Sequence, residues 1–522
     1  MEHRSPSPAA ERLALGVILA LGLGLRLWGL TYGLPHPLAR PDEKVVLERI
    51  FGFERGDFNP HWFMYPSFHL YLLWAYLKAL VLAAHALGLQ AVTGLAELAR
   101  QDPGRLYLLA RSLSVVLGTV TIGVAFLLAR TLWDSRAGLL AALVLSVAFL
   151  HVRDSHFFKP DVALGLATVA TLLGCVHLQR RGTLAAAVLA GAISGIALSI
   201  KYSALVLLPV VIAAAQAGRS GVWRRLLAAG AAALVALLLT SPYIALDYRS
   251  FAGWMAYTRL LVQYGGEGLG SGFRYHARHS FLLAQGLPLS LFMLGALAWA
   301  STRGALLPIT AFVVVSVVQL GASSLAYTRY VTPLLPVLAV VTGGALAALT
   351  ARVPAGGRRA ALTAALLVAL LVHPLHSSAR FDQIAAQPDT RLLARSWLDE
   401  HVPSGTTVLV LGAPWPYTFG DPLLDGYRVR RNPTLDPAVG YVVTHEHPVP
   451  FSRVPERFET LRPRLRLEAT FSPFGDHTEP PARTVFETRD AFYVPLAGFQ
   501  GVVRGGPVIR IYSVVGVNGA AR

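Results

Sequence analysis

Long apolar segments recur along this chain and constrain its fold more than any other feature. Several of them reach about 18 residues or more, the length that an α-helix needs to cross a bilayer. Only 14% of the residues are charged, whereas soluble domains carry roughly 25%. The sequence therefore predicts an α-helical polytopic membrane protein. Its net charge of +17 does not require a nucleic-acid partner, because basic residues of membrane proteins gather in cytoplasmic loops.

About eleven apolar runs are predicted to span the membrane. They cover residues 12–34, 106–130, 137–152, 162–179, 184–200, 203–217, 226–243, 281–300, 304–322, 331–351 and 360–376. The first run is too long for the apolar region of a cleaved signal peptide, so we interpret it as a retained signal anchor. The single cysteine, Cys175, lies inside an apolar run. One cysteine excludes both a disulfide within the chain and a metal site built from cysteines.

The apolar stretch 67–90 decides the topology, because counting it as a span would move every later loop across the membrane. Without it, the cytoplasmic loops contain many arginines and only one acid, Asp134. Those arginines are Arg130, Arg136, Arg180, Arg181, Arg219, Arg224, Arg225, Arg303, Arg352, Arg358 and Arg359. The positive-inside rule favours this arrangement, and Lys78 suits a helix on the membrane surface. We therefore predict a cytoplasmic N-terminus and a first outer loop over 35–105 that carries surface helices.

The composition changes near residue 377, where charges, prolines and short β-like runs replace the long apolar segments. A helix capped by Asp389 or Thr390 is predicted over 390–400. Strands are predicted at residues 407–411, 440–444, 464–471 and 508–515. The chain is thus predicted to consist of a transmembrane domain, 1–376, and a small extracytoplasmic α/β domain, 377–522.

Two predicted outer segments carry charged residues at unusual density. Asp42 and Glu43 come shortly after the first predicted span, and acids at such a depth usually serve a site. A second, short segment contains His151, Arg153, Asp154, His156, Lys159 and Asp161. A hairpin between two spans needs no such density. The four lysines of the chain, which suit phosphate binding, also fall on the predicted outer side; they are Lys44, Lys78, Lys159 and Lys201.

Carboxylates and cations at the outer surface of a membrane protein favour chemistry on a lipid-linked phosphate. Transfer of a sugar from such a carrier needs a base that deprotonates the acceptor hydroxyl, and Asp or Glu suits this role. It also needs cations that stabilise the departing phosphate, and Lys, Arg or His suits that role. The residue types on the predicted outer face therefore favour an enzyme that uses a polyprenyl-phosphate-linked sugar.

Several short motifs follow one another along most of the chain. The first are Arg40-Pro-Asp-Glu43, Tyr65-Pro-Ser-Phe-His-Leu-Tyr71, His151-Val-Arg153, Ser155-His-Phe157 and Asp161-Val162. The later ones are Gly195-Ile-Ala-Leu-Ser-Ile-Lys-Tyr202, Arg329-Tyr-Val-Thr-Pro-Leu-Leu-Pro336 and Asp389-Thr-Arg-Leu-Leu-Ala-Arg-Ser-Trp-Leu-Asp-Glu400. Their order resembles the membrane glycosyltransferases of the C superfold. It is most similar to the protein O-mannosyltransferase and aminoarabinose transferase group, glycosyltransferase family 39.

This resemblance implies roles for individual residues. It implies that Asp42 acts as the base or positions the acceptor, with Glu43 as its neighbour or alternative. It implies a second acid at Asp161 and carrier-phosphate contacts at Lys201 and Arg329. Further candidates for binding the substrate or the carrier phosphate are Lys159, His156, Arg153 and Tyr65. The resemblance also implies a single displacement with inversion at the sugar carbon, and a hexosyl or pentosyl transferase of the cytoplasmic membrane.

Other interpretations remain open at this point. Asp42 and Glu43 suit the first turn of a helix, which favours negative charge. His445-Glu-His447 has the spacing of a metal-binding pair on a strand, although a zinc site there is the weaker interpretation. We expect no cofactor and no metal, with a divalent cation at Asp42, Glu43 and Asp161 as the alternative. A transporter or lipid flippase is the second functional class, and a non-enzymatic scaffold is the third. The residues do not name the sugar or the acceptor, which is a protein, a glycolipid or an envelope polymer.

Overall fold

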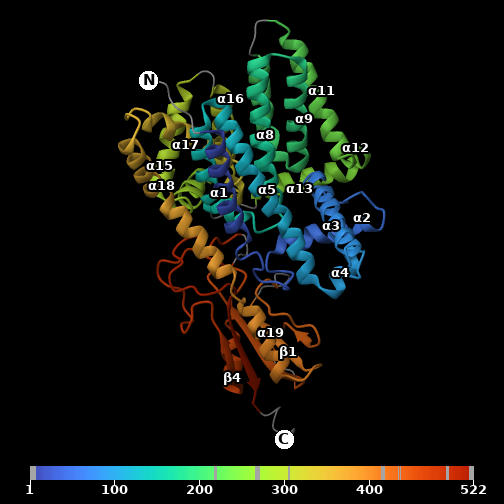
Figure 1. Cartoon of the computed structure of the whole chain (residues 1–522). Helices are drawn as coiled ribbons and strands as arrows, with labels where there is room; N and C mark the ends of the chain where they lie inside the picture. The colour runs from blue at the N-terminus through green and yellow to red at the C-terminus, as the bar shows by residue number, and fades with distance from the viewer. Residues whose placement is uncertain are drawn as a thin grey trace. The chain divides into compact units, whose positions relative to one another are not determined.

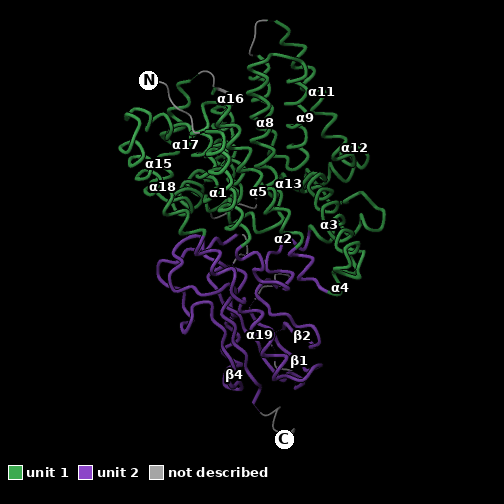
Figure 2. The backbone as a smooth tube through the Cα atoms, viewed as in Figure 1, with its two compact units in different colours: residues 1–27, 46–101, 109–378 green, residues 28–45, 102–108, 379–522 purple. Residues whose placement is uncertain are grey.

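The computed structural model describes residues 7–216, 220–264, 271–303, 306–412, 418–432, 434, 437–489 and 493–515. The chain forms two compact units (Figure 2). Unit 1 comprises residues 1–27, 46–101 and 109–378, and unit 2 comprises residues 28–45, 102–108 and 379–522. The segment predicted as the first outer loop, 35–105, is therefore divided between the two units.

Unit 1 is a helical bundle (Figure 1). The helices that fall in the predicted apolar runs are α1 (Pro8–Leu27), α5 (Pro103–Leu132), α6 (Ser135–Val147), α7 (Phe149–Asp154), α8 (Pro160–Arg181), α9 (Leu184–Ile200), α10 (Leu208–Ala215), α11 (Val222–Thr240), α15 (Leu287–Ser301), α16 (Leu307–Ala322), α17 (Leu335–Thr350) and α18 (Gly357–Ala385). The first residues of α5, 103–108, and the last of α18, 379–385, belong to unit 2. Every predicted apolar run contains helical residues. This confirms that the chain is a polytopic helical membrane protein.

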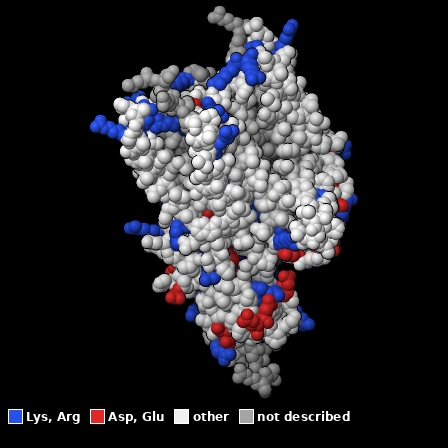
Figure 3. Space-filling model, viewed as in Figure 1, with Lys and Arg blue, Asp and Glu red and all other residues white. Residues whose placement is uncertain are grey.

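The number of spans depends on how short and bent helices are counted. Within the described residues, six helices are long and apolar enough to cross a membrane by length and composition, and a seventh span results if a helix pair bent by 117° is one span. That pair joins residues 272–283 to α15, and five further apolar helices are shorter. Figure 3 shows few charged atoms along the sides of the long helices, whereas Lys and Arg atoms gather towards the upper end of unit 1. Such a distribution suits helix sides that face lipid.

Glu54 joins three helices near the N-terminal end of the chain. It ends α2 (Pro41–Glu54), and its carboxylate accepts hydrogen bonds from Trp74 Nε1 (3.1 Å) and Lys78 Nζ (3.2 Å) of α3 (Phe68–Ala86). The backbone N–H of Leu95, at the start of α4 (Leu95–Gln101), donates to the same side chain at 3.2 Å. Lys78 is therefore neutralised by a carboxylate of α2. By length and composition α3 is also one of the six possible spans.

Two glycines let α9 and α11 approach closely. These helices run side by side with α8 in Figure 1. A Cβ atom at Gly191 or Gly195 would overlap the carbonyl oxygen of Ala229 or Ala233, respectively. Small residues four apart are typical of helix contacts in membranes, where close backbone packing replaces the hydrophobic effect. The contact matters for the site because α9 ends at Ile200, directly before Lys201.

Replacing Gly195 with leucine is expected to destabilise unit 1, because the side chain must displace the backbone of α11. We expect a loss of about 1–3 kcal/mol in the free energy of unfolding, measured by thermal unfolding in detergent. The matched control is Gly230→Leu in α11, where nothing lies within 4 Å of the added Cβ. Equal stability of the two variants would contradict the close packing of α9 and α11.

Unit 2 contains a five-stranded mixed sheet in the order β2-β1-β3-β5-β4. The strands are β1 (Thr407–Leu411), β2 (Arg428–Arg430), β3 (Val439–Glu446), β4 (Leu465–Phe471) and β5 (Val508–Val514). β1 is parallel to β2 and β3, whereas β5 is antiparallel to β3 and β4. The four predicted strands are confirmed, and the predicted helix is α19 (Thr390–His401), capped by Asp389. The short strand β2 was not predicted.

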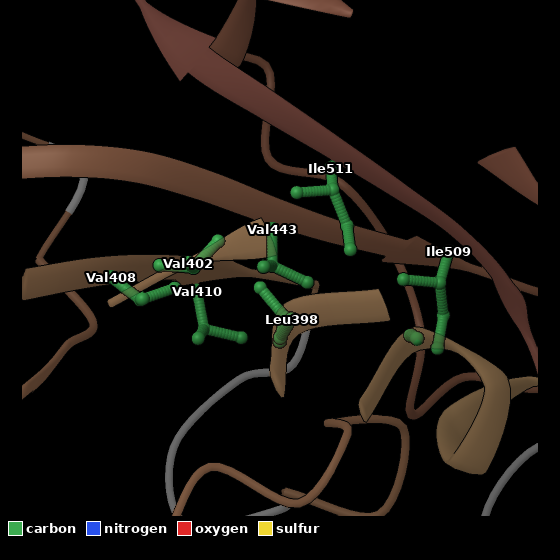
Figure 4. Packing of buried hydrophobic residues seen from close by; sticks show 8 residues of the cluster. Leu398, Val402, Val408, Val410, Val443, Ile509 and Ile511 are labelled. Atoms are coloured by element: carbon green, nitrogen blue, oxygen red, sulfur yellow. The ribbon is translucent and has the colours of Figure 1, made fainter. Parts of the chain in front are cut away.

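Alternation along the strands builds a core on each face of this sheet. Figure 4 shows Leu398 of α19 among Val408, Val410 and Val443 of β1 and β3, with Ile511 of β5 nearby. The intervening residues face the other way, and Leu409, Leu411, Val442 and Tyr512 form a second core there. This pattern follows from the two-residue period of a strand. The first of these cores fixes the position of α19 on the sheet.

Candidate active site

Asp161 stands in the first turn of α8, immediately after Pro160. Proline suits the first position of a helix because its missing N–H has no partner there anyway, and the helix N-terminus favours a carboxylate. The side chain of Asp161 is only 1% exposed. A buried carboxylate needs a partner of opposite charge, since its desolvation is costly.

Lys201 supplies that partner. The chain leaves α9 at Lys201 in an extended conformation (φ −156°, ψ 135°) before the 3₁₀-helix Tyr202–Leu207 begins. The Lys201 Nζ atom lies 2.6 Å from Asp161 Oδ1, and the lysine side chain is 12% exposed. The other carboxylate oxygen, Oδ2, is buried and has no hydrogen-bond partner among the described residues. Asp161 and Lys201, 40 positions apart in sequence, thus form a buried ion pair in which only one carboxylate oxygen contacts the lysine.

Three cationic side chains act on this pair or belong to it. Lys201, Arg329 and Lys159 all act electrostatically on Asp161. Arg329 lies in a 3₁₀ turn, η4 (Thr328–Val331), and Lys159 is the extended residue before α8; both are 6% exposed. Three cationic side chains are thus gathered around one buried carboxylate. Lysine and arginine side chains in such a cluster suit the binding of an anion.

Arg153 and Asp154 hold the turn that carries Arg329. Arg153 Nε and Nη2 donate to Asp154 Oδ1 at 2.8 and 2.7 Å. Arg153 Nη1 also donates to Thr328 Oγ1 at 3.1 Å, and Thr332 Oγ1 donates to Asp154 Oδ2. The two threonines flank Arg329 in sequence. Arg153, which the sequence predicts to bind substrate, thus pairs with Asp154 and contacts the first residue of η4.

Three tyrosines line the cations. The Lys201 Nζ atom lies 4.5 Å from the ring centre of Tyr330 and 5.8 Å from that of Tyr65, and the Arg329 guanidinium lies 4.1 Å from that of Tyr327. Cations over aromatic faces are stabilised when they are poorly solvated. Tyr65 was predicted, but Tyr327 and Tyr330 were missed. Their flanking position in Tyr327-Thr-Arg329-Tyr330 is the sequence signal that could have revealed them.

Hydrogen bonds to the neighbours of Tyr65 fix its position. Tyr202 Oη donates to the carbonyl of Phe63 at 3.2 Å. The N–H of Ser67 donates to Ser241 Oγ at 2.9 Å, and Ser241 also hydrogen-bonds Ser199 of α9. The segment before α3 is therefore tied to the ends of α9 and α11. Lys201 directly follows the same end of α9.

Two buried histidines lie in this region. His156 Nδ1 donates to the carbonyl of Val152 at 3.0 Å, one turn earlier in its own segment. His69 of α3 donates from Nε2 to the carbonyl of Phe158 at 3.3 Å, and the charge of Asp161 acts on it. His156 was predicted as a binding residue and His69 was not. The structure thus adds His69 to the surroundings of Asp161.

Asp42 and Glu43 belong to unit 2, in its segment 28–45. Both stand in the first turn of α2, after Pro41. Glu43 is fully buried, whereas Asp42 is partly exposed. A partly exposed carboxylate can exchange protons with a bound hydroxyl, and a fully buried one has less access. Burial therefore distinguishes Asp42 from Glu43.

The possible metal pair in unit 2 is engaged in hydrogen bonds. His445 Nε2 lies 2.9 Å from Asp421 Oδ1, and Nδ1 lies 3.0 Å from Ser452 Oγ. His447 is also buried, and its Nδ1 accepts the N–H of Val449 at 3.2 Å. Among the residues described, no group of three or more His, Cys, Asp or Glu side chains is arranged to hold a metal ion.

Comparison with solved structures identifies the fold of this chain. The family model described as dolichyl-phosphate-mannose-protein mannosyltransferase matches residues 104–245. The solved structure of ArnT from Cupriavidus metallidurans bound to undecaprenyl phosphate is similar over 98% of this chain and 99% of that chain, with a TM-score of 0.55 and 15% identity. The chain has the C-superfold architecture. The predicted resemblance to membrane glycosyltransferases is thereby confirmed.

A second C-superfold structure agrees. It is the oligosaccharyltransferase of Archaeoglobus fulgidus tethered to an acceptor peptide with the NVT sequon, with a TM-score of 0.54 and 10% identity over 97% of this chain and 89% of that chain. Against two other structures of that enzyme, the chain spans only 63% and 60% of their length. No curated protein sequence matches this chain. The family-model match includes Asp161 and Lys201 but not Asp42, Glu43 or Arg329.

Proposed function

We propose that this protein is a glycosyltransferase that moves a sugar from a polyprenyl-phosphate carrier to an acceptor at the outer face of the cytoplasmic membrane. The single observation that carries this proposal is the cluster of Lys201, Arg329 and Lys159 around the buried Asp161. Its lysine and arginine side chains suit the phosphate of a carrier lipid. The similar ArnT structure holds undecaprenyl phosphate, which supports a lipid phosphate as the ligand.

The proposed reaction is a single displacement at the sugar carbon. Asp42 takes the proton of the acceptor hydroxyl as that oxygen bonds to the sugar carbon. The bond between this carbon and the phosphate oxygen breaks, and its electron pair leaves with the polyprenyl phosphate. Lys201 and Arg329 stabilise the negative charge that develops on the phosphate. The configuration at the sugar carbon inverts. The proposed transferase moves a hexose or pentose, and it uses no cofactor or metal.

The proposed topology has about eleven spans, a cytoplasmic N-terminus and an extracytoplasmic C-terminal domain. In this arrangement α3 lies on the outer membrane surface, which suits Lys78 and its bond to Glu54. Arg130 in the last turn of α5 and Arg180 in that of α8 would then face the cytoplasm, as the positive-inside rule requires. Asp161 and Lys201, at the opposite ends of α8 and α9, would face outward.

A transporter or flippase is the competing function. It predicts charged residues near the middle of spans and discontinuous helices in two related halves. Asp161 and Lys201 instead occupy helix ends, which favours the transferase. Arg26 is fully buried in α1 and donates to the carbonyls of Gly22 and of Ser146, near the end of α6. These hydrogen bonds give this buried charge a structural role, so it does not favour a transporter.

Purified protein offered radiolabelled polyprenyl-phosphate sugars and a mixed pool of hydroxyl acceptors is expected to release polyprenyl phosphate and label an acceptor. The product should show inverted configuration by NMR. Facilitated movement of the lipid across proteoliposomes, without any transfer to an acceptor, would instead support the flippase. The acceptor pool should contain peptides, glycolipids and envelope polysaccharide, so that the labelled class names the acceptor.

A further inference from the structure

The segment that precedes Asp42 is folded within unit 2 as successive tight turns. The N–H groups of Leu34, His36, Ala39 and Glu43 each donate to the carbonyl three residues earlier, at 2.9–3.0 Å. Ala39 and Arg40 are 1% and 2% exposed. Because each turn shares residues with the next or adjoins it, a restraint on residues 36–38 carries over to the first turn of α2. Asp42 stands in that turn.

His36 fastens this segment to the C-terminal residues of unit 2. Its Nε2 lies 2.9 Å from the carbonyl oxygen of Asp421, which can only accept, so Nε2 carries the proton. Its Nδ1 accepts the N–H of Leu38 at 3.1 Å. Burial, together with the charge of Arg391, lowers the pKa of His36 to about 3. The ring is therefore neutral at physiological pH, in the one tautomer that makes both hydrogen bonds.

Arg391 holds the same segment from α19. Arg391 donates two hydrogen bonds to Asp389, from Nε to Oδ1 and from Nη2 to Oδ2, both at 2.8 Å. The side chains of this bidentate ion pair are 0% (Arg391) and 1% (Asp389) exposed. This pair leaves Nη1 to donate to the carbonyls of Leu38 (3.4 Å) and Phe419 (2.7 Å). A bidentate arginine has a fixed orientation. Asp389 thus aims the remaining N–H groups at residues 38 and 419.

The rest of the motif Asp389-Thr390-Arg391 fixes α19 itself. The Thr390 side chain donates to the carbonyl of Pro507 at 2.7 Å, and its N–H donates to that of Gly505 at 3.0 Å. Both carbonyls lie just before β5. The apolar contacts of α19 with the sheet need no buried arginine. The hydrophobic core therefore accounts for the packing of α19 on the sheet, but not for a buried guanidinium that donates to Phe419 at 2.7 Å and to Leu38 at 3.4 Å.

We infer that Arg391 is a positioning residue: oriented by Asp389, it holds the turns at residues 36–40 and so places Asp42 for proton transfer. This inference rests on the proposed function, in which Asp42 is the base. It gives residues 379–522 of unit 2 a role in the reaction, although the predicted catalytic residues of this unit, Asp42 and Glu43, lie in its segment 28–45.

The test compares Arg391→Gln with Arg395→Gln in the full-length protein. Arg395 is a matched control one turn later in α19, since it pairs with Asp399 at 2.6 Å and donates to the carbonyls of Leu423 and Asp425. For Arg391→Gln we expect hydrogen exchange in peptides covering residues 34–41 to rise at least about tenfold. We also expect kcat to fall about 100-fold while the donor KM stays unchanged, as misplacement of a catalytic group predicts. Arg395→Gln should change neither.

A second variant changes a residue within the turns at residues 36–40. His36→Asn removes the hydrogen bond to Asp421 and leaves the Asp389–Arg391 pair intact, so it tests separately whether the restraint on residues 36–40 affects kcat. It should also raise exchange over 34–41 and lower kcat. Arg391→Lys keeps the charge but cannot make the two parallel hydrogen bonds to Asp389. Its kcat should fall nearly as strongly as that of Arg391→Gln.

The outcomes separate this inference from the proposed function. Unchanged exchange over 34–41, or raised exchange with unchanged kcat, would overturn the positioning role. Hydrogen exchange that rises equally in β3 would show a general loss of structure in Arg391→Gln. The Arg391→Lys variant, which keeps a positive charge beside Asp389, then decides: unchanged kcat would overturn the positioning role, and lowered kcat with unchanged exchange in β3 would support it. Full activity of Asp42→Asn would refute the proposed base, whatever the exchange data show about Arg391.

Discussion

Replacing Asp42 with asparagine is expected to lower kcat by about 10²–10⁴-fold, the usual contribution of a general base. Asparagine keeps the shape of the side chain but cannot accept the proton of the acceptor hydroxyl. Binding of the lipid donor should change little, because the proposed phosphate ligands are Lys201 and Arg329. The measurement is single-turnover transfer with saturating polyprenyl-phosphate sugar, together with donor binding by the quenching of tryptophan fluorescence.

Glu43→Gln is the matched control for this prediction. Glu43 is fully buried in the same turn of α2, so its substitution should affect stability more than kcat. A larger loss of kcat in Glu43→Gln than in Asp42→Asn would reverse the assignment of the base. Transfer that persists undiminished in Asp42→Asn would remove Asp42 from the mechanism altogether.

Replacing Lys201 with methionine is expected to have two separable effects. Binding of polyprenyl phosphate should weaken by about tenfold or more, since a charge-assisted contact contributes roughly 1.5–3 kcal/mol. Stability should also fall by about 3–5 kcal/mol, because the substitution leaves the buried Asp161 carboxylate without its ion-pair partner. Donor binding in detergent and thermal unfolding measure the two effects independently.

The double variant Asp161→Asn with Lys201→Met separates stability from function. It removes both charges of the pair and should regain most of the stability, but it should still bind the carrier weakly. Lys78→Met is a second control, because it removes another lysine that pairs with a carboxylate, Glu54, at 3.2 Å. Carrier binding that recovers fully in the double variant would exclude Lys201 as a phosphate ligand.

Much of the candidate site can be predicted from the sequence, because charged residues are conspicuous in an apolar chain. Asp161, Lys201, Arg329, Lys159 and Tyr65 all stand out by residue type and predicted location. The structure brings them together in unit 1. The different roles of similar residues could not be predicted in the same way. Arg153 has the same charge as Lys201, yet it braces η4 through Asp154 and Thr328.

The residues that were missed have ordinary sequence contexts. Tyr327 and Tyr330 look like aromatic residues at a membrane interface until Lys201 and Arg329 are placed over their rings. Arg391 looks like a surface arginine of an amphipathic helix, but it is fully buried. In each case the partner lies far away in sequence. Composition and spacing carry no information about such partners.

The sequence by itself determined the apolar helices, the change to an α/β fold near residue 377 and the limits of most strands of unit 2. These properties are local, because hydropathy over about 18 residues and a two-residue period are enough to specify them. Only the tertiary structure decided that Lys201 pairs with Asp161, that Glu43 is buried while Asp42 is not, and that the C-terminal residues hold the segment before Asp42. Those outcomes depend on packing between distant segments, where burial and fixed geometry choose one partner among several of equal charge.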